Sequence, residues 1–99
     1  MVVTIHVDTN VRVGDDLHIE NIMRAITAAT RNANVRNELM QYTGNTLRGI
    51  EIGSRGSYTK PGFYCITVRW LVSVDLDISE LIKATMILLT HAGVMDDID

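Results

Sequence analysis

The sequence predicts an α+β fold, a two-layer sandwich in which helices cover one face of a mainly antiparallel three-stranded sheet. Apolar residues alternate with polar ones near the N-terminus and again over a long run from Phe63 to Leu76. A period of two is typical of strands with one buried face. Two other segments repeat their apolar residues at helical spacing. The resulting order, β-α-(α)-β-β-α, is that of a two-layer α+β domain.

The run from Phe63 to Leu76 is the longest and most apolar strand candidate, and we expect it at the centre of the sheet. The first strand, Val2 to Val7, and a shorter one between Thr46 and Gly53 would flank it, which gives the order 1-3-2. Large apolar residues occupy every second position of the central strand: Tyr64, Ile66, Val68, Trp70, Val72 and Val74.

The end of the first strand is ambiguous in the sequence. Asp8, Thr9 and Asn10 have turn chemistry. Val11 and Val13 can therefore either extend the strand past a bulge or return as a short hairpin arm.

The helices have recognisable ends. Asp15 or Asp16 can cap the first helix, and its apolar stripe consists of Ile19, Ile22, Met23, Ile26, Ala29 and Ala33. A second, short helix would end at Gly44 and bury one face formed by Val35, Leu39 and Tyr42. Asp77 and Glu80 have the spacing of a capping box. They start a last helix that runs to about His91, and Met95 to Asp99 is predicted to be a frayed acidic tail.

This order of elements resembles a ferredoxin-like unit that lacks its last strand. The resemblance is one of topology, so it implies a fold and no activity.

Length and composition narrow the class of protein. The 99 residues suffice for one domain (1–99), and 46% of them are hydrophobic. The net charge of -3 argues against a surface built throughout to hold phosphates, although a local basic patch is compatible with it. The lone Cys65 cannot form an internal disulfide, and no segment reads as a signal peptide or a membrane span. We therefore expect a cytoplasmic protein.

No catalytic or metal-binding pattern is visible, so we expect no enzyme activity, no cofactor and no metal. His18 and His91 have no partners at ligand spacing. Thr4, His6, Glu51, Thr67 and Arg69 would converge on the sheet face away from the helices. Such a group is usually a solvated face with cross-strand pairs.

Two features predict association. The last helix has a wider apolar arc than contact with one sheet requires. The first strand contains neither Lys nor Pro, so its edge is open to another strand. We expect a homo-oligomer, preferably a dimer, and a protein partner, with an interface formed by Val3, Ile5, Ala84, Ile87 and Leu88.

The segment from Gly53 to Gly62 is predicted to be a glycine-rich loop, and it is the best candidate for a ligand site. Arg55, Tyr58 and Lys60 could bind a nucleic acid or a nucleotide there, or the loop could be a hairpin tip without a partner.

The leading hypothesis is a small non-enzymatic interaction protein that acts by binding another protein. Small accessory proteins of phages and mobile elements are a class of this size. The alternatives are a nucleic-acid or nucleotide binder and a structural subunit of a ring or particle.

Overall fold

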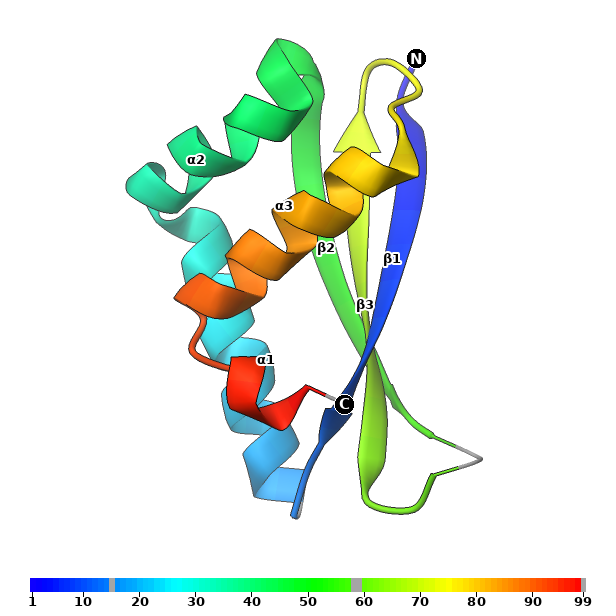
Figure 1. Cartoon of the computed structure of the whole chain (residues 1–99), viewed down its shortest axis with the longest axis vertical. Helices are drawn as coiled ribbons and strands as arrows, with labels where there is room; N and C mark the ends of the chain where they lie inside the picture. Colours follow the sequence, from blue (N-terminus) through cyan, green and yellow to red (C-terminus); the bar gives the residue numbers. More distant parts are fainter. Residues whose placement is uncertain (15, 58–59, 99) are drawn as a thin grey trace.

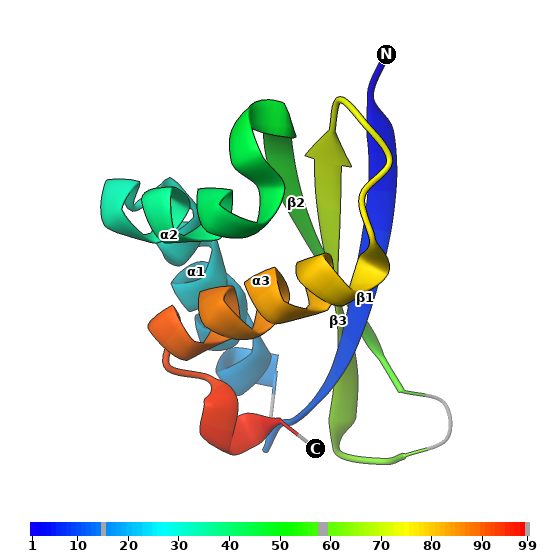
Figure 2. The ribbon, with the colours of Figure 1, turned by 45° about the horizontal axis from the view of Figure 1, so that its top comes forward.

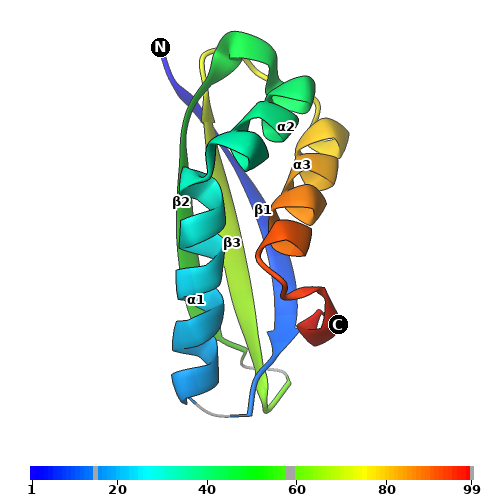
Figure 3. The ribbon, with the colours of Figure 1, turned by 90° about the vertical axis from the view of Figure 1, so that its left-hand side faces the viewer.

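The computed structural model describes residues 1–14, 16–57 and 60–98, with the side chains of Asp16 and Leu17 left out. Two layers make up the fold, a three-stranded sheet and a layer of helices on one of its faces (Figures 1 and 3). This confirms the predicted α+β class and element order. The elements are β1 (Val3–Arg12), α1 (Asp16–Arg31), α2 (Ala33–Thr43), β2 (Leu47–Gly56), β3 (Phe63–Val72) and α3 (Ile78–His91), with short 3-10 turns at Gly44–Thr46 and Met95–Asp97.

The sheet has the predicted order β1-β3-β2, and β3 pairs antiparallel with both neighbours. Four alternate residues of β3 are completely buried: Ile66, Val68, Trp70 and Val72. The strand ends at Val72, earlier than predicted, and Val74 is 48% exposed. Both ladders end at Val72, which lies opposite Val3 and Leu47, and beyond it only the amide of Ser73 is tied back, donating to the carbonyl of Thr46 at 2.9 Å.

β1 is one continuous strand, which decides between the two alternatives left by the sequence. Its register runs without a shift from Val3 opposite Val72 to Arg12 opposite Phe63. The odd-numbered residues of β1 are the more buried ones along the whole strand, because Thr9 is half-buried between the buried Val7 and Val11. Val11 and Val13 therefore extend the strand direction without a bulge or a hairpin arm.

β2 is longer than predicted. It continues to Gly56, which pairs with Tyr64, so the connection to β3 is shorter than the predicted loop from Gly53 to Gly62. Arg55 consequently lies within a strand, opposite Cys65. A bulge at Arg48 shifts the register near the start of β2.

Local capping sets the helix boundaries. The side chain of Asn32 accepts hydrogen bonds from the amides of Asn34 (2.9 Å) and Val35 (3.2 Å) and starts α2, so Ala33 does not belong to the stripe of α1 and is exposed. Asp77 caps α3 as predicted, accepting from the amide of Ser79 at 2.9 Å. The predicted cap of α1 at Asp15 or Asp16 lies outside the described side chains.

The prediction that Ala84 and Leu88 contact a partner is wrong, because both are completely buried within this chain's own core. α3 packs against α1 and α2 as well as against the sheet, so its buried arc is wider than contact with the sheet alone requires. Ile87 is partly buried and packs against the same core. The exposed apolar residues of α3 are Ile78, Ile82 and Met86.

The C-terminal segment is docked and not frayed. Val94 is buried, and Ile98 packs against the core and forms an antiparallel bridge with Val11. The described end of the chain therefore lies beside the lower end of β1 (Figure 1). Within the described residues, no helix combines the length and the apolar character that a membrane span requires.

Candidate functional site

The outer edge of β1 carries backbone groups that point away from the sheet. Val13 donates to the carbonyl of Gly62 at 2.8 Å, and this pair continues the β1–β3 register. Hydrogen-bonded and non-bonded pairs alternate along an antiparallel ladder, so the odd-numbered residues of β1 bond to β3. The amides and carbonyls of Thr4, His6 and Asp8 therefore face the open side.

One end of this edge is already covered. The bridge between Ile98 and Val11 occupies the edge near its C-terminal end. From Val3 to Asn10, no other strand or bridge of the described chain pairs with the outer side of β1. The open stretch is thus centred on His6.

A groove of about 340 Å³ lies between this open edge and α3. Its apolar wall is a row of side chains one helical turn apart, Ile78, Ile82 and Met86, whose exposed fractions are 46%, 47% and 38%. Its other residues are His6, Val7, Asp8, Thr9 and Thr85. An unpaired strand edge beside an apolar wall has the shape of a site for an added strand. We call this site the edge groove.

The edge of β2 is different in character. It contains the bulge at Arg48 and three glycines, Gly49, Gly53 and Gly56. Bulges and charged side chains are devices that discourage edge-to-edge pairing. Of the two edges of the sheet, β1 is the one without a bulge.

The sheet face opposite the helices carries cross-strand pairs, as the sequence indicated. His6, Arg69 and Glu51 lie side by side in one row, and Nε of Arg69 is 3.4 Å from Oε1 of Glu51. In the next row, the hydroxyl of Thr67 donates to Oδ1 of Asp8 at 2.6 Å. Thr4 lies opposite Leu71. The predicted residues therefore lie on one face of the sheet, and their contacts are those of paired side chains on a protein surface.

Two cations lie close to an aromatic ring on the same face, where β1 ends opposite the first residue of β3. Cζ of Arg12 lies 5.3 Å and Nζ of Lys60 lies 5.0 Å from the ring centre of Phe63. Arg55 projects from the same face, opposite Cys65 in the neighbouring row. We call Arg12, Arg55, Lys60 and Phe63 the cation–aromatic corner.

Sequence reasoning found Arg55 and Lys60 but missed Arg12 and Phe63. The signal that could have found them is strand pairing, because Arg12 lies opposite Phe63 only once the register is fixed. The third predicted residue, Tyr58, lies outside the described residues.

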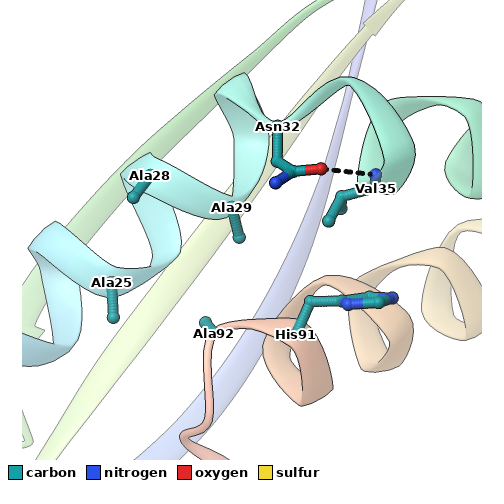
Figure 4. A pocket seen from close by; sticks show the side chains of 7 residues that line it. All are labelled: Ala25, Ala28, Ala29, Asn32, Val35, His91 and Ala92. Carbon is teal, nitrogen blue, oxygen red and sulfur yellow. Dashed lines mark hydrogen bonds between the residues drawn. The ribbon is translucent and has the colours of Figure 1, made fainter.

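A second hollow, of about 320 Å³, lies where the ends of α1, α2 and α3 meet (Figure 4). Ala25, Ala28 and Ala29 line it from α1, and their small side chains leave the space open. The polar groups at its rim are already engaged. Asn32 caps α2, and Nε2 of His91 is 2.7 Å from Oε2 of Glu38. This hollow therefore has space for a small ligand, but the polar side chains of Asn32 and His91 at its rim are already bonded to other groups of the chain.

Among the described residues, no three His, Cys, Asp or Glu side chains are grouped so that they could hold a metal ion. Comparison of the chain with family models, with curated proteins and with solved structures found no match.

Proposed function

We propose that this protein is a non-enzymatic interaction module that acts as a homodimer, formed by antiparallel pairing of two β1 edges. The observation that carries the proposal is the edge groove, in which unpaired backbone groups of β1 lie beside the exposed apolar row of α3. A second β1 would bond to Thr4, His6 and Asp8 and extend the sheet to six strands. The unpartnered Cys65 thiol suits a reducing compartment such as the cytoplasm.

The length of the open edge selects the register. In a two-fold arrangement the outward-facing residues must pair with one another, and the Ile98 bridge limits the open stretch to one side of Val11. Pairing is longest when the two-fold axis passes between the two His6 residues. Thr4 of one copy then lies opposite Asp8 of the other, so both form hydrogen-bonded pairs.

This register also fills the edge groove. Val3 and Ile5 point to the helical side of the sheet, as the burial pattern of β1 shows. In the His6-centred register, Ile5 of a second copy lies beside Val7, and its Val3 lies beside Thr9. Both side chains would enter the groove and contact the row formed by Ile78, Ile82 and Met86. The proposed interface keeps Val3 and Ile5 from the sequence prediction. On α3 it consists of Ile78, Ile82 and Met86 in place of Ala84 and Leu88.

The contrast between the two edges favours a closed dimer over a ring or filament. Rings and filaments need two different complementary surfaces, here β1 of one copy against β2 of the next. The bulge of β2 disfavours that contact. Pairing of β1 with β1 leaves the β2 edges outermost.

A proline at position 6 tests the proposal directly. The amide of His6 faces the open side, so His6→Pro removes no hydrogen bond within the monomer, while the ring blocks pairing with a second strand. Ser54→Pro is the matched control. Ser54 is exposed in β2, and its amide also faces outward, because Ser57 and Phe63 form a bonded pair in the same ladder.

Light scattering after size-exclusion chromatography at tens of micromolar measures the outcome. The wild type and Ser54→Pro are expected at twice the chain mass of 11.0 kDa, and His6→Pro is expected at 11.0 kDa. Circular dichroism confirms that each variant is folded. A wild-type protein that stays at the mass of one chain, or a folded His6→Pro variant that still dimerises, contradicts the proposal.

A further inference from the structure

We propose that the cation–aromatic corner binds single-stranded nucleic acid on the sheet face that the helices leave free. The ligand would place a base against Phe63 and its phosphates near Lys60, Arg55 and Arg12. This function goes beyond self-association and uses the sheet face opposite the helices, whereas the apolar wall of the edge groove belongs to α3. Figure 2 shows the helices on one side of the sheet and the other side uncovered by any helix.

Charge is unevenly divided between this face and the rest of the chain. The face and its adjoining turn carry four basic side chains (Arg12, Arg55, Lys60 and Arg69) and two carboxylates (Asp8 and Glu51), which is a net charge of +2. The whole chain has nine basic and twelve acidic residues, so the remainder carries five and ten, a net charge of -5. A polyanion is therefore attracted to this face and repelled by the rest of the molecule.

The two carboxylates on the face each have a polar partner, whereas part of the basic charge has no ion-pair partner among the described residues. Asp8 accepts from Thr67, and Glu51 pairs with Arg69. Among the residues that the structure describes, neither Arg12 nor Arg55 forms an ion pair. Arg12 and Phe63 share a hollow of about 180 Å³ with Asp96 and Asp97, and these carboxylates offset the charge of Arg12. Arg55, which lies on the opposite edge strand, is therefore expected to contribute more to binding than Arg12.

The surface beside the corner is formed in part by the guanidinium of Arg69. Gly53 has no side chain, and the guanidinium of Arg69 lies over it, with Nη1 3.0 Å from where a Cβ would be. The planes of a guanidinium and of an aromatic ring are the surfaces on which unpaired bases stack. Arg69 and Phe63 lie on the same face of β3, separated by Cys65 and Thr67 along the strand.

These features favour a single strand over a duplex. The bases of a duplex are stacked on one another and cannot reach a ring on a sheet, whereas those of a single strand can. Three or four basic groups neutralise only a few phosphates, so we expect micromolar or weaker affinity and a modest dependence on salt, with a slope of about -0.7 per phosphate contacted.

Fluorescence anisotropy with labelled oligo(dT), oligo(U) and a duplex of equal length tests the proposal. The wild type is expected to bind at least one of the two single strands, and to bind it more tightly than the duplex, at about 50 mM salt. Arg55→Gln combined with Lys60→Gln should weaken binding by about ten-fold or more and lower the salt slope. Phe63→Leu keeps an apolar side chain but removes the ring, and should weaken binding by roughly 5- to 100-fold.

The matched control is Arg24→Gln combined with Lys83→Gln, which removes the same charge from exposed helix positions. This control should leave affinity within about two-fold of the wild type, because neither side chain lies near the corner. Equal loss in the control and the corner variants, preference for the duplex, unchanged binding by Phe63→Leu, or no binding to either single strand overturns the proposal.

The test is independent of the proposed dimer, because each chain carries a complete corner. Folded His6→Pro is expected to retain binding per chain, and loss of binding by that variant would overturn the assignment to a corner complete in one chain. Failure of dimerisation and failure of nucleic-acid binding are therefore separate results.

Discussion

The indole of Trp70 and the hydroxyl of Thr85 join the sheet to α3 through a buried hydrogen bond, with Nε1 donating to Oγ1 at 2.9 Å. The same hydroxyl donates to the carbonyl of Leu81 at 2.7 Å, one helical turn earlier. Trp70 is completely buried and Thr85 nearly so. Each polar atom thus has a partner in a region without access to water, which fixes the position of α3 along the sheet.

Replacement of Thr85 by valine should leave the Trp70 N–H buried without an acceptor. Because the two side chains have a similar shape, the main effect is loss of that partner, and the free energy of unfolding should fall by about 1–3 kcal/mol. Urea denaturation measures the change. Thr90→Val is the control, because Thr90 also bonds to a carbonyl four residues earlier, that of Met86, but is exposed. Equal losses in the two variants would show that the bond to Trp70 contributes nothing.

Truncation of two apolar residues of α3 should change the free energy of unfolding by very different amounts. Leu88 is completely buried, so Leu88→Ala should lower the free energy of unfolding by about 2–5 kcal/mol. Ile82 is 47% exposed, so Ile82→Ala should change it by only about 0.5 kcal/mol.

The stability of these variants is compared in the His6→Pro background, so that association does not contribute to it. With His6 intact, Ile82→Ala should raise the dimer dissociation constant measured by sedimentation, because it shortens the wall of the edge groove. A loss of stability in Ile82→Ala as large as that in Leu88→Ala would contradict the assignment of these two positions.

Asp77 should make part of the stability depend on pH. The hydrogen bond from the Ser79 amide, helped by the Ser79 side chain and by the charge of Lys83, lowers the pKa of Asp77 below its ordinary value of 3.8. Its contribution is therefore complete above the unfolded-state pKa and is lost as the pH falls through the lower folded-state pKa. Asp77→Asn keeps a capping side chain but cannot titrate. Its unfolding free energy, measured against pH, should fall less steeply in acid than that of the wild type, and parallel curves would contradict this account.

Cysteine cross-linking can verify the register of the proposed dimer. In hydrogen-bonded antiparallel pairs the Cα atoms are about 5.5 Å apart, a separation that a disulfide can span. In a Cys65→Ser background, His6→Cys should cross-link to a second copy under mild oxidation. Thr4→Cys and Asp8→Cys should not cross-link alone but should do so when mixed. Self-linking by Thr4→Cys would indicate a shifted register.

Local patterns in the sequence were sufficient for the elements and their order. The period-two run around Trp70 identified the central strand, and the spacing of Asp77 and Glu80 identified the start of α3. These signals depend on residues close together in the chain, so they can be read without knowledge of the fold. The extent of β1 and of β2 was not predicted, because pairing with β3 holds Thr9 and Arg55 extended despite their turn-like neighbours.

The candidate sites were only partly visible in the sequence. It correctly indicated that β1 is an edge without Lys or Pro between Val2 and Val7. It could not separate the buried Leu88 from the exposed Ile82, since both are apolar residues of one wide helical arc. That distinction depends on where α1 and α2 pack against α3, which is a property of contacts between distant segments.

The amino-acid sequence by itself therefore determined the α+β class, the central position of β3 and the unprotected character of β1, because each follows from spacing within a short segment. Only the tertiary structure decided which apolar residues of α3 remain exposed, how Ile98 limits the open edge, and that Arg12 and Lys60 meet at Phe63. The physical reason is that the burial of a residue and its neighbours depend on segments far apart in the chain. Strand register and helix packing bring those segments together, and neither can be read from one short segment.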